Sequence, residues 1–305
     1  MESVHTVLGP RAPEEFTQVL PHEHLLCDFS PVTGQGPHVL NDLELIIPEV
    51  LELPDVTRTC LVEVTPADVG RNPAGLRAIS ERTGLSVVMG TGWYRESYHP
   101  QEIDRLSVNE IADRMVEELT TGVPVTGPAV QAGIIGEIGS DRDYVSAAEE
   151  RVLRAAARAS NRTGAAVTTH AFMYPVGLPQ LAVMLEERAD PSRIVIGHAD
   201  TYMNPDYHRE LLKRGVYVEF DTCGRTHLNP DARRADALVA LIRAGWLEQL
   251  LISSDRCFRS DLKAFGGVGY PWALTGFVAL LKDRGVSADE IDVLTRVNPL
   301  RMLAW

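Results

Sequence analysis

Short runs of apolar, largely β-branched residues recur along the whole chain, and each run ends in polar residues. The eight runs are residues 18–22, 59–65, 86–91, 132–137, 165–170, 193–198, 216–221 and 250–255. Near-continuous apolar runs of this length are typical of strands that are buried on both faces of a parallel sheet. The pattern therefore predicts eight parallel strands.

Segments with helical spacing separate these runs. The clearest is 147–162, where Val152 and Ala156 lie on one stripe and Glu149 and Arg154 lie opposite. The segments 178–188 and 232–244 behave similarly. Eight strands that alternate with helices predict a (β/α)8 TIM barrel. A doubly wound α/β sheet is the alternative, but the glycine-rich phosphate turn of that fold is missing after the first run.

Composition supports one ordinary folded unit. Hydrophobic residues make up 45% and charged residues 23% of the 305 positions, which is typical of a globular protein with a buried core. The sequence contains no low-complexity tract, long linker or break in composition. We therefore expect a single domain over residues 1–305, which is an ordinary length for an α/β barrel.

The charge balance narrows the range of partners. The 42 acidic and 29 basic residues give a net charge of −13, which argues against a nucleic-acid-binding surface. No stretch approaches the roughly 18 apolar residues of a membrane span, and the first residues lack the pattern of a signal peptide. The four cysteines are scattered. These features predict a cytoplasmic protein without a nucleic-acid or membrane partner.

Residue types that bind metals stand at the ends of five of the eight runs. They are His22, His24, Glu137, His170, His198 and Asp255. The strand ends of a TIM barrel converge on one mouth, and residues two apart on a strand face the same side. Singly, such a histidine is more often a core residue, and such an aspartate more often caps a helix. Together, four imidazoles and two carboxylates exceed the needs of one catalytic zinc and suit two metals with a bridging carboxylate and hydroxide.

Several longer motifs carry a resemblance to a known family. They include residues 6–10 and 20–25, the stretch 90–94, the Gly-Glu-Ile-Gly segment 136–139, and residues 196–198, 254–255 and 263–270. Through these motifs the chain resembles the phosphotriesterase-like family of the amidohydrolase superfamily over nearly its whole length. The resemblance implies a binuclear metallohydrolase on a TIM barrel with an N-terminal β-hairpin. Members are often homodimers, so a homodimer is one expected assembly.

The resemblance also implies a ligand set. His22, His24 and Asp255 would bind the more buried metal, and His170 and His198 the more exposed one. Glu137 occupies the position of a bridging carbamylated lysine in the best-known members, and a subgroup, the phosphotriesterase homology proteins, has this same Gly-Glu-Ile-Gly pattern. Because glutamate is shorter, the metals must lie closer to the fourth strand, or that strand must shift inward. Two divalent ions are expected, with zinc first and manganese, iron or cobalt also suited to these ligands.

The expected reaction is hydrolysis of a carboxylic ester, lactone or amide by the metal-bridging hydroxide, with Asp255 as the catalytic proton acceptor. A phosphotriester or organophosphate hydrolase is the first alternative, and a non-catalytic ligand-binding barrel is the second. Tyr94, after the third run, is a candidate to bind a substrate oxygen, although an aromatic residue there is as often a packing residue. We thus expect a small molecule as the partner.

Cations follow the last two runs and suggest an anionic group on the substrate. They are Arg225, Arg256 and Lys263, together with Arg259. The alternative is that they form ion pairs with local acids such as Asp221 and Asp261. The sequence favours neither interpretation over the other.

Overall fold

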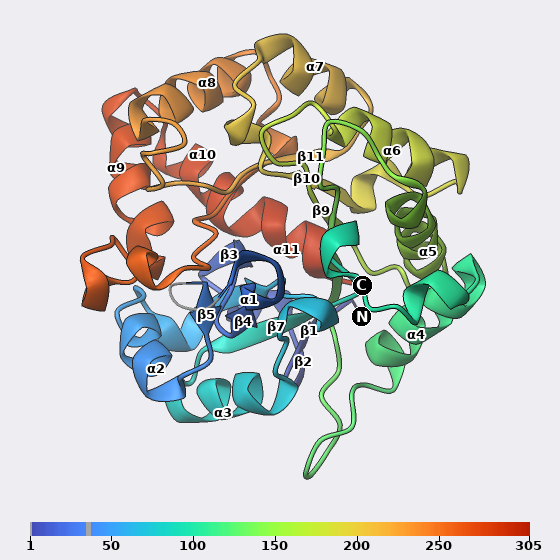
Figure 1. Cartoon of the computed structure of the whole chain (residues 1–305). Helices are drawn as coiled ribbons and strands as arrows, with labels where there is room; N and C mark the ends of the chain where they lie inside the picture. The colour runs from blue at the N-terminus through green and yellow to red at the C-terminus, as the bar shows by residue number, and fades with distance from the viewer. Residues whose placement is uncertain (1, 35–37) are drawn as a thin grey trace.

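The computed structural model describes residues 2–34 and 38–305, and its strands form one barrel sheet and two short pairs (Figure 1). The barrel strands are β3 (Gln18–Glu23), β6 (Thr59–Glu63), β7 (Ser86–Thr91), β8 (Ile134–Gly139), β9 (Val167–His170), β10 (Ile194–Gly197), β11 (Tyr217–Phe220) and β12 (Leu250–Ile252). The short pairs are β1 (Val4–Thr6) with β2 (Gly9–Arg11), and β4 (Cys27–Asp28) with β5 (Val39–Leu40).

All eight predicted runs are strands of the barrel, and they pair in parallel in chain order from β3 to β12. The ring is nearly closed between β12 and β3, where the backbone N–H of His22 donates to Ser253 Oγ at 3.1 Å. The N–H of Asp255 donates in turn to the carbonyl of His22 at 3.2 Å. The (β/α)8 prediction is therefore confirmed. β12 is shorter than its run, so Asp255 lies in the loop that follows.

Helices follow almost every strand; most of them form an outer ring around the barrel, and the last one lies across its base (Figure 1). They are α1 (Ser30–Thr33), α2 (Leu43–Leu51), α3 (Pro73–Thr83), α4 (Val108–Thr120), α5 (Ala147–Thr163), α6 (Gly177–Glu186), α7 (Pro205–Lys213), α8 (Asp231–Arg243), α9 (Gly276–Asp283), α10 (Ala288–Asp292) and α11 (Asn298–Leu303). The three predicted helices correspond to α5, α6 and α8. In the described ranges, no helix combines the length and apolar character that crossing a bilayer requires.

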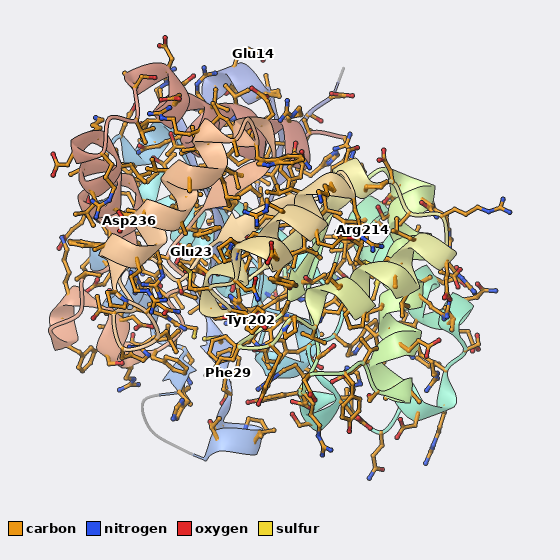
Figure 2. The ribbon with its side chains drawn as sticks, turned by 90° about the horizontal axis from the view of Figure 1, so that it is seen from above. Glu14, Glu23, Phe29, Tyr202, Arg214 and Asp236 are labelled. Carbon is orange, nitrogen blue, oxygen red and sulfur yellow. The ribbon has the colours of Figure 1, made fainter. Side chains whose placement is uncertain are left out.

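The apolar core has two parts. One lies between the strands and the helices, and the other fills the barrel interior with side chains such as Val19, Val62 and Leu251. Leu300 and Leu303 of α11 belong to the interior cluster, so this last helix closes the barrel opposite the strand ends. Charged side chains such as those labelled Arg214 and Asp236 extend from the outer helices in Figure 2. Because the base is closed, the opposite mouth of the barrel is the end available for a functional site.

The N-terminal hairpin expected from residues 6–10 is present as β1 and β2. Ser3 exchanges two backbone hydrogen bonds with Trp305, both 3.3 Å long. His5 stacks on the Trp305 ring with centroids 4.1 Å apart. The N-terminal hairpin segment and the last residue are thereby held together.

Strand β8 departs from a regular strand where it carries Glu137. Its register with β9 shifts between Ile135 and Ile138, and the N–H of Glu137 donates at 2.7 Å to the carbonyl of Val64, beyond β6. Because β7 lies between β6 and β8 in the sheet, this bond shows that the backbone at Glu137 is displaced toward the barrel axis. Gly136 permits the displacement, since its φ is +124° and a Cβ there would collide with the Thr168 carbonyl.

The bulge generates a stability prediction. Gly136→Ala adds both a positive-φ penalty and a backbone clash, so we expect a loss of about 3 kcal/mol in the free energy of unfolding. Gly285→Ala is the matched control, because Gly285 has a φ of +82° but nothing within 4 Å of an added Cβ. That variant should lose only about 1 kcal/mol. Equal losses in urea denaturation would show that the close approach to Thr168 is unimportant.

Candidate metal centre

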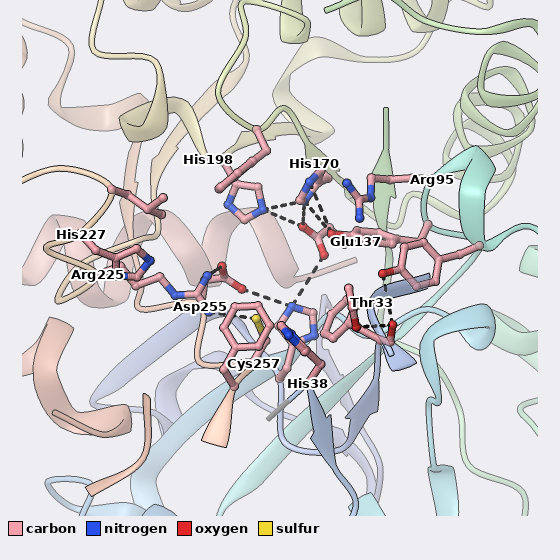
Figure 3. Close-up of a pocket in the computed structure, with 17 residues that line it drawn as sticks. Thr33, His38, Arg95, Glu137, His170, His198, Arg225, His227, Asp255 and Cys257 are labelled. Carbon is pink, nitrogen blue, oxygen red and sulfur yellow. Dashed lines mark hydrogen bonds and ion pairs between the residues drawn. The ribbon is translucent and has the colours of Figure 1, made fainter. Parts of the chain in front are cut away.

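The six predicted ligands converge at the open mouth of the barrel, and the structure brings all of them together. His22 lies in β3, Glu137 in β8 and His170 at the end of β9, while the others follow strands directly or within a short loop. None of the six exposes more than 6% of its surface. Figure 3 shows the labelled members converging on the carboxylate of Glu137. Polar side chains buried this close together need partners that compensate their charge.

Glu137 lies between two pairs of histidines. Its Oε1 is 2.6 Å from His170 Nδ1 and 2.8 Å from His198 Nε2. On the other side, Glu137 Oε1 is 3.6 Å from His22 Nε2, and Glu137 Oε2 is 3.6 Å from His24 Nε2. Three groups of three residues have ligand atoms close enough to share an ion, and two of these groups contain Glu137. The third group is His22, His198 and Asp221.

Asp255 completes the side formed by the first two histidines. Its Oδ1 lies 3.3 Å from His24 Nε2 and 3.8 Å from His22 Nε2. Its Oδ2 pairs with Arg225 Nη1 at 2.7 Å. One carboxylate oxygen thus faces the histidines while the other is held by a cation.

Partners on the far side of the rings orient three of the imidazoles. His24 Nδ1 lies 2.8 Å from Thr65 Oγ1, and His198 Nδ1 lies 2.8 Å from Asp221 Oδ1. His22 Nδ1 faces a carboxylate oxygen of Glu219 at 3.3 Å. Acceptors at Nδ1 favour the tautomer whose Nε2 is free to bind a metal.

The structure also allows a direct test of whether a metal fits. The Nε2 of His22 is buried and has no hydrogen-bond partner among the described residues, although two carboxylates lie within 4 Å. An unpaired buried nitrogen is costly, and a cation between it and Glu137 would satisfy both groups. The donor set of imidazoles and carboxylates therefore fits a divalent ion.

The charge states of the ligands also bear on metal binding. Burial opposes ionisation of Glu137, but the facing histidines outweigh it and hold its pKa well below its ordinary value. Burial likewise opposes ionisation of Asp255, and Arg225 with the facing histidines lowers its pKa. Burial lowers the pKa of His170 to about 4, so its ring is neutral near pH 7. Burial opposes protonation of His24 and His198, but Asp255 and Asp221 outweigh it and raise the pKa of these two rings. Because anionic carboxylates and neutral imidazoles are the forms that bind metals, an ion bound at these two rings would displace protons.

A cavity of about 190 Å³ opens above the ligands. Five aromatic residues line it: Phe29, Tyr94, Tyr98, Phe172 and Phe258. The hydroxyl of Tyr94 lies 3.1 Å from His170 Nδ1. The walls therefore leave room for a small molecule in contact with the ligand cluster.

The predicted substrate-binding residues divide into two groups. Tyr94 and Arg225 line the cavity, whereas Arg256 and Lys263 do not. Arg256 is buried, with Nε donating to the carbonyl of Gly269 at 3.2 Å, and Lys263 pairs with the exposed Glu52. The structure thus separates the cations that the sequence groups together, and our substrate proposal leaves Arg256 and Lys263 out.

Other lining residues were missed by sequence reasoning. These residues are Arg95, Phe172, Cys257, His38 and His227. Asp221 was considered only as an ion-pair partner for loop cations, yet it holds His198. A usable signal existed for Arg95, since it directly follows Tyr94 after a strand end.

Comparisons with known proteins agree with this geometry. A model of the phosphotriesterase family matches residues 2–303. The phosphotriesterase homology protein of Escherichia coli (strain K12) is 36% identical over 92% of this chain and 95% of its own length. The chain therefore belongs to the phosphotriesterase family, and it is a metal-dependent hydrolase of small-molecule substrates.

A solved structure of the same Escherichia coli protein and one further relative inform the chemistry. A crystal structure of the Escherichia coli phosphotriesterase homology protein, complexed with phosphate in the active site, superposes with a TM-score of 0.90 at 35% identity, covering 95% of this chain and 99% of that one. The N-acetyltaurine hydrolase of Tetraodon nigroviridis is 28% identical over 99% of this chain and 98% of its own.

Because Glu137 lies between the two histidine pairs, we predict that its charge is needed for metal binding. Glu137→Gln keeps the size of the side chain but removes the charge, so metal affinity should fall more than about tenfold. The control is Glu149→Gln, because Glu149 is also buried but accepts from the backbone N–H of Asp141 and Ser146 at 2.7 and 2.9 Å. Elemental analysis after dialysis measures the outcome, and full metal content in folded Glu137→Gln would refute the role.

Proposed function

We propose that this chain is a two-metal hydrolase that cleaves a carboxylic amide, ester or lactone. The observation that carries the proposal is the place of Glu137, whose carboxylate faces two separate histidine pairs. A single ion would leave one of these pairs without a cation. The cytoplasmic location and the homodimer expected from the sequence stay predictions.

Each metal has its own ligands, with Glu137 shared. His22, His24 and Asp255 would hold one ion, and His170 with His198 the other. Zinc is the first candidate for these ligands, and manganese, iron or cobalt also suit them. When bound, such ions polarise the oxygen of the scissile bond and lower the pKa of water toward 7.

Asp255 is the proton carrier in this proposal. Its Oδ1 is directed at the ligand cluster, while Arg225 fixes its Oδ2. A carboxylate held in one orientation can take the proton of the attacking water and deliver it to the departing nitrogen or oxygen. Arg225 acts through Asp255 here, because its other nitrogen is engaged by Asp261 at 3.0 Å.

Tyr94 supplies a hydrogen-bond donor to the substrate oxygen. Burial raises the pKa of Tyr94 well above its ordinary value, so the phenol keeps its proton near neutral pH. Its hydroxyl already lies beside His170, where one ion would bind. The aromatic walls restrict water around the reacting group, which strengthens such a bond.

Similar proteins support two bond types. The relatives named N-acetyltaurine hydrolase support an amide as the scissile bond. The phosphate in the active site of the Escherichia coli relative favours a phosphoester as the second candidate. We place the amide first because the aromatic cavity of about 190 Å³ suits a small acyl group better than a triester with three substituents.

The proton-carrier role predicts a specific loss of turnover. Asp255→Asn should lower kcat by about 10²- to 10⁴-fold, because the amide cannot accept a proton. Asp261→Asn is the matched control, since Asp261 also pairs with Arg225 but does not line the cavity. It should change kcat far less. Metal content measured alongside separates lost proton transfer from lost metal, and unchanged turnover in Asp255→Asn would contradict the assignment.

The proposal as a whole is tested by metal analysis and a substrate panel. We expect two divalent ions per chain and hydrolysis of N-acyl amino acids, simple esters or lactones. Preferential cleavage of aryl phosphate esters would overturn the choice of bond and favour the second candidate. A chain that holds no metal and cleaves nothing would instead be a ligand-binding barrel.

A further inference from the structure

The cavity contains two arginines, and their charges are compensated to different degrees. Arg225 pairs with Asp255 at 2.7 Å and with Asp261 at 3.0 Å. Arg95 has one ion pair, in which its Nε lies 3.5 Å from Asp141 Oδ1. Both side chains line the same cavity, so an incoming molecule meets one cation held by two carboxylates and one held by a single, longer ion pair.

The acid beside Arg95 is also occupied elsewhere. Asp141 accepts from the backbone N–H and the hydroxyl of Ser97, each at 2.9 Å. The Nε of Arg95 is buried and has no hydrogen-bond partner among the described residues. The Nε of Arg225 likewise has no hydrogen bond among these residues, so the two arginines differ in their ion pairs. A partly buried guanidinium held by one ion pair of 3.5 Å pays a desolvation cost that a second anion would offset.

Neighbouring residues fix the position of the Arg95 guanidinium. Its Cζ lies 4.8 Å from the ring centre of Tyr94 and 5.3 Å from that of Tyr98. Its aliphatic stem runs over Gly139 at the end of β8, where any Cβ would collide with the stem. Stacking between rings keeps a guanidinium in one plane with low entropy loss on binding.

Arg95 lies close to the proposed reacting centre. Figure 3 shows Arg95 beside His170 and Glu137, on the opposite side of the cavity from Arg225. One small molecule can therefore place one of its groups at Arg95 and its scissile bond at the histidines.

We propose that Arg95 is a specificity-determining residue that binds a carboxylate or sulfonate group of the substrate. The inference rests on the proposed function and names its substrate class: small N-acyl compounds with an anionic group on the amine side. The guanidinium fork offers two parallel N–H donors to two oxygens of such a group. A purely structural role, in which Arg95 only packs on the tyrosines, predicts no difference between charged and neutral substrates.

The test uses three acetamides of similar size. N-acetyltaurine carries a sulfonate, N-acetyl-β-alanine a carboxylate, and N-propylacetamide no charge. Arg95→Met keeps the stem over Gly139 but removes the fork, so KM for the two anionic compounds should rise about 10- to 100-fold. KM for N-propylacetamide and kcat should change less than about twofold. Arg95→Lys, which keeps the charge, should restore part of the preference.

The matched control is Arg142→Met. Arg142 is exposed, donates to the hydroxyl of Tyr144 at 2.9 Å and does not line the cavity. It removes the same charge from the same side of the barrel, so it should leave the anion preference intact. Salt should weaken binding of the anions to the unaltered protein more than to Arg95→Met.

Isothermal titration calorimetry of the metal-loaded proteins with the same compounds separates this inference from the proposed function. If nothing is hydrolysed, the proposed function fails, yet the Kd values still decide the role of Arg95. Loss of affinity for only one anion supports the inference and identifies the preferred group. Equal losses for charged and neutral compounds in Arg95→Met, or no anion preference in the unaltered protein, would overturn it.

Discussion

The site depends on placing one carboxylate, that of Glu137, within reach of histidines from three other strands. A regular strand could not do so with a side chain as short as glutamate. The bulge in β8 moves the backbone inward, and the bond from Glu137 N–H to the Val64 carbonyl fixes it there at 2.7 Å. Two glycines make room for the bulge. A Cβ at Gly136 would collide with the Thr168 carbonyl, and a Cβ at Gly90 would collide with the Gly136 carbonyl. The fold thus adapts its backbone to the length of one side chain.

A second layer of buried acceptors then decides which way the imidazoles face. Asp221 accepts from the backbone N–H of His198 and lies within hydrogen-bond distance of its Nδ1, both at 2.8 Å. Thr65 lies at the Nδ1 of His24 in the same way. These partners lie just after two different strands, so the rim of the barrel itself selects the tautomers. Pre-orientation of this kind lets the ligand set exist before any ion binds.

The sequence predicts the barrel and the ligands for one physical reason. Parallel strands buried on both faces appear as apolar runs, and their polar ends must meet at one mouth. The bulge can be predicted only in part. The short glutamate requires that either the metals or the fourth strand move, and a Gly-Glu step, which fits a regular strand equally well, does not say which. The loop cations also resist prediction. Arg256 directly follows Asp255, yet its side chain binds backbone carbonyls away from the cavity, while Arg95 follows Tyr94 and faces into it. Loop backbone conformation decides these directions, and the order of residue types does not encode it.

The net charge of −13 describes the exterior of this protein and misrepresents its cavity. Two arginines and two carboxylates, Arg95, Arg225, Glu137 and Asp255, line that cavity, so their formal charges cancel in the bare protein. Each divalent ion bound by the histidines would add two positive charges to a space walled by aromatic rings, where electrostatic interactions are poorly screened. The mouth of an acidic barrel then attracts anions. Because Arg225 is already held by two carboxylates, Arg95 is the lining cation best able to turn that attraction into a defined orientation of the substrate.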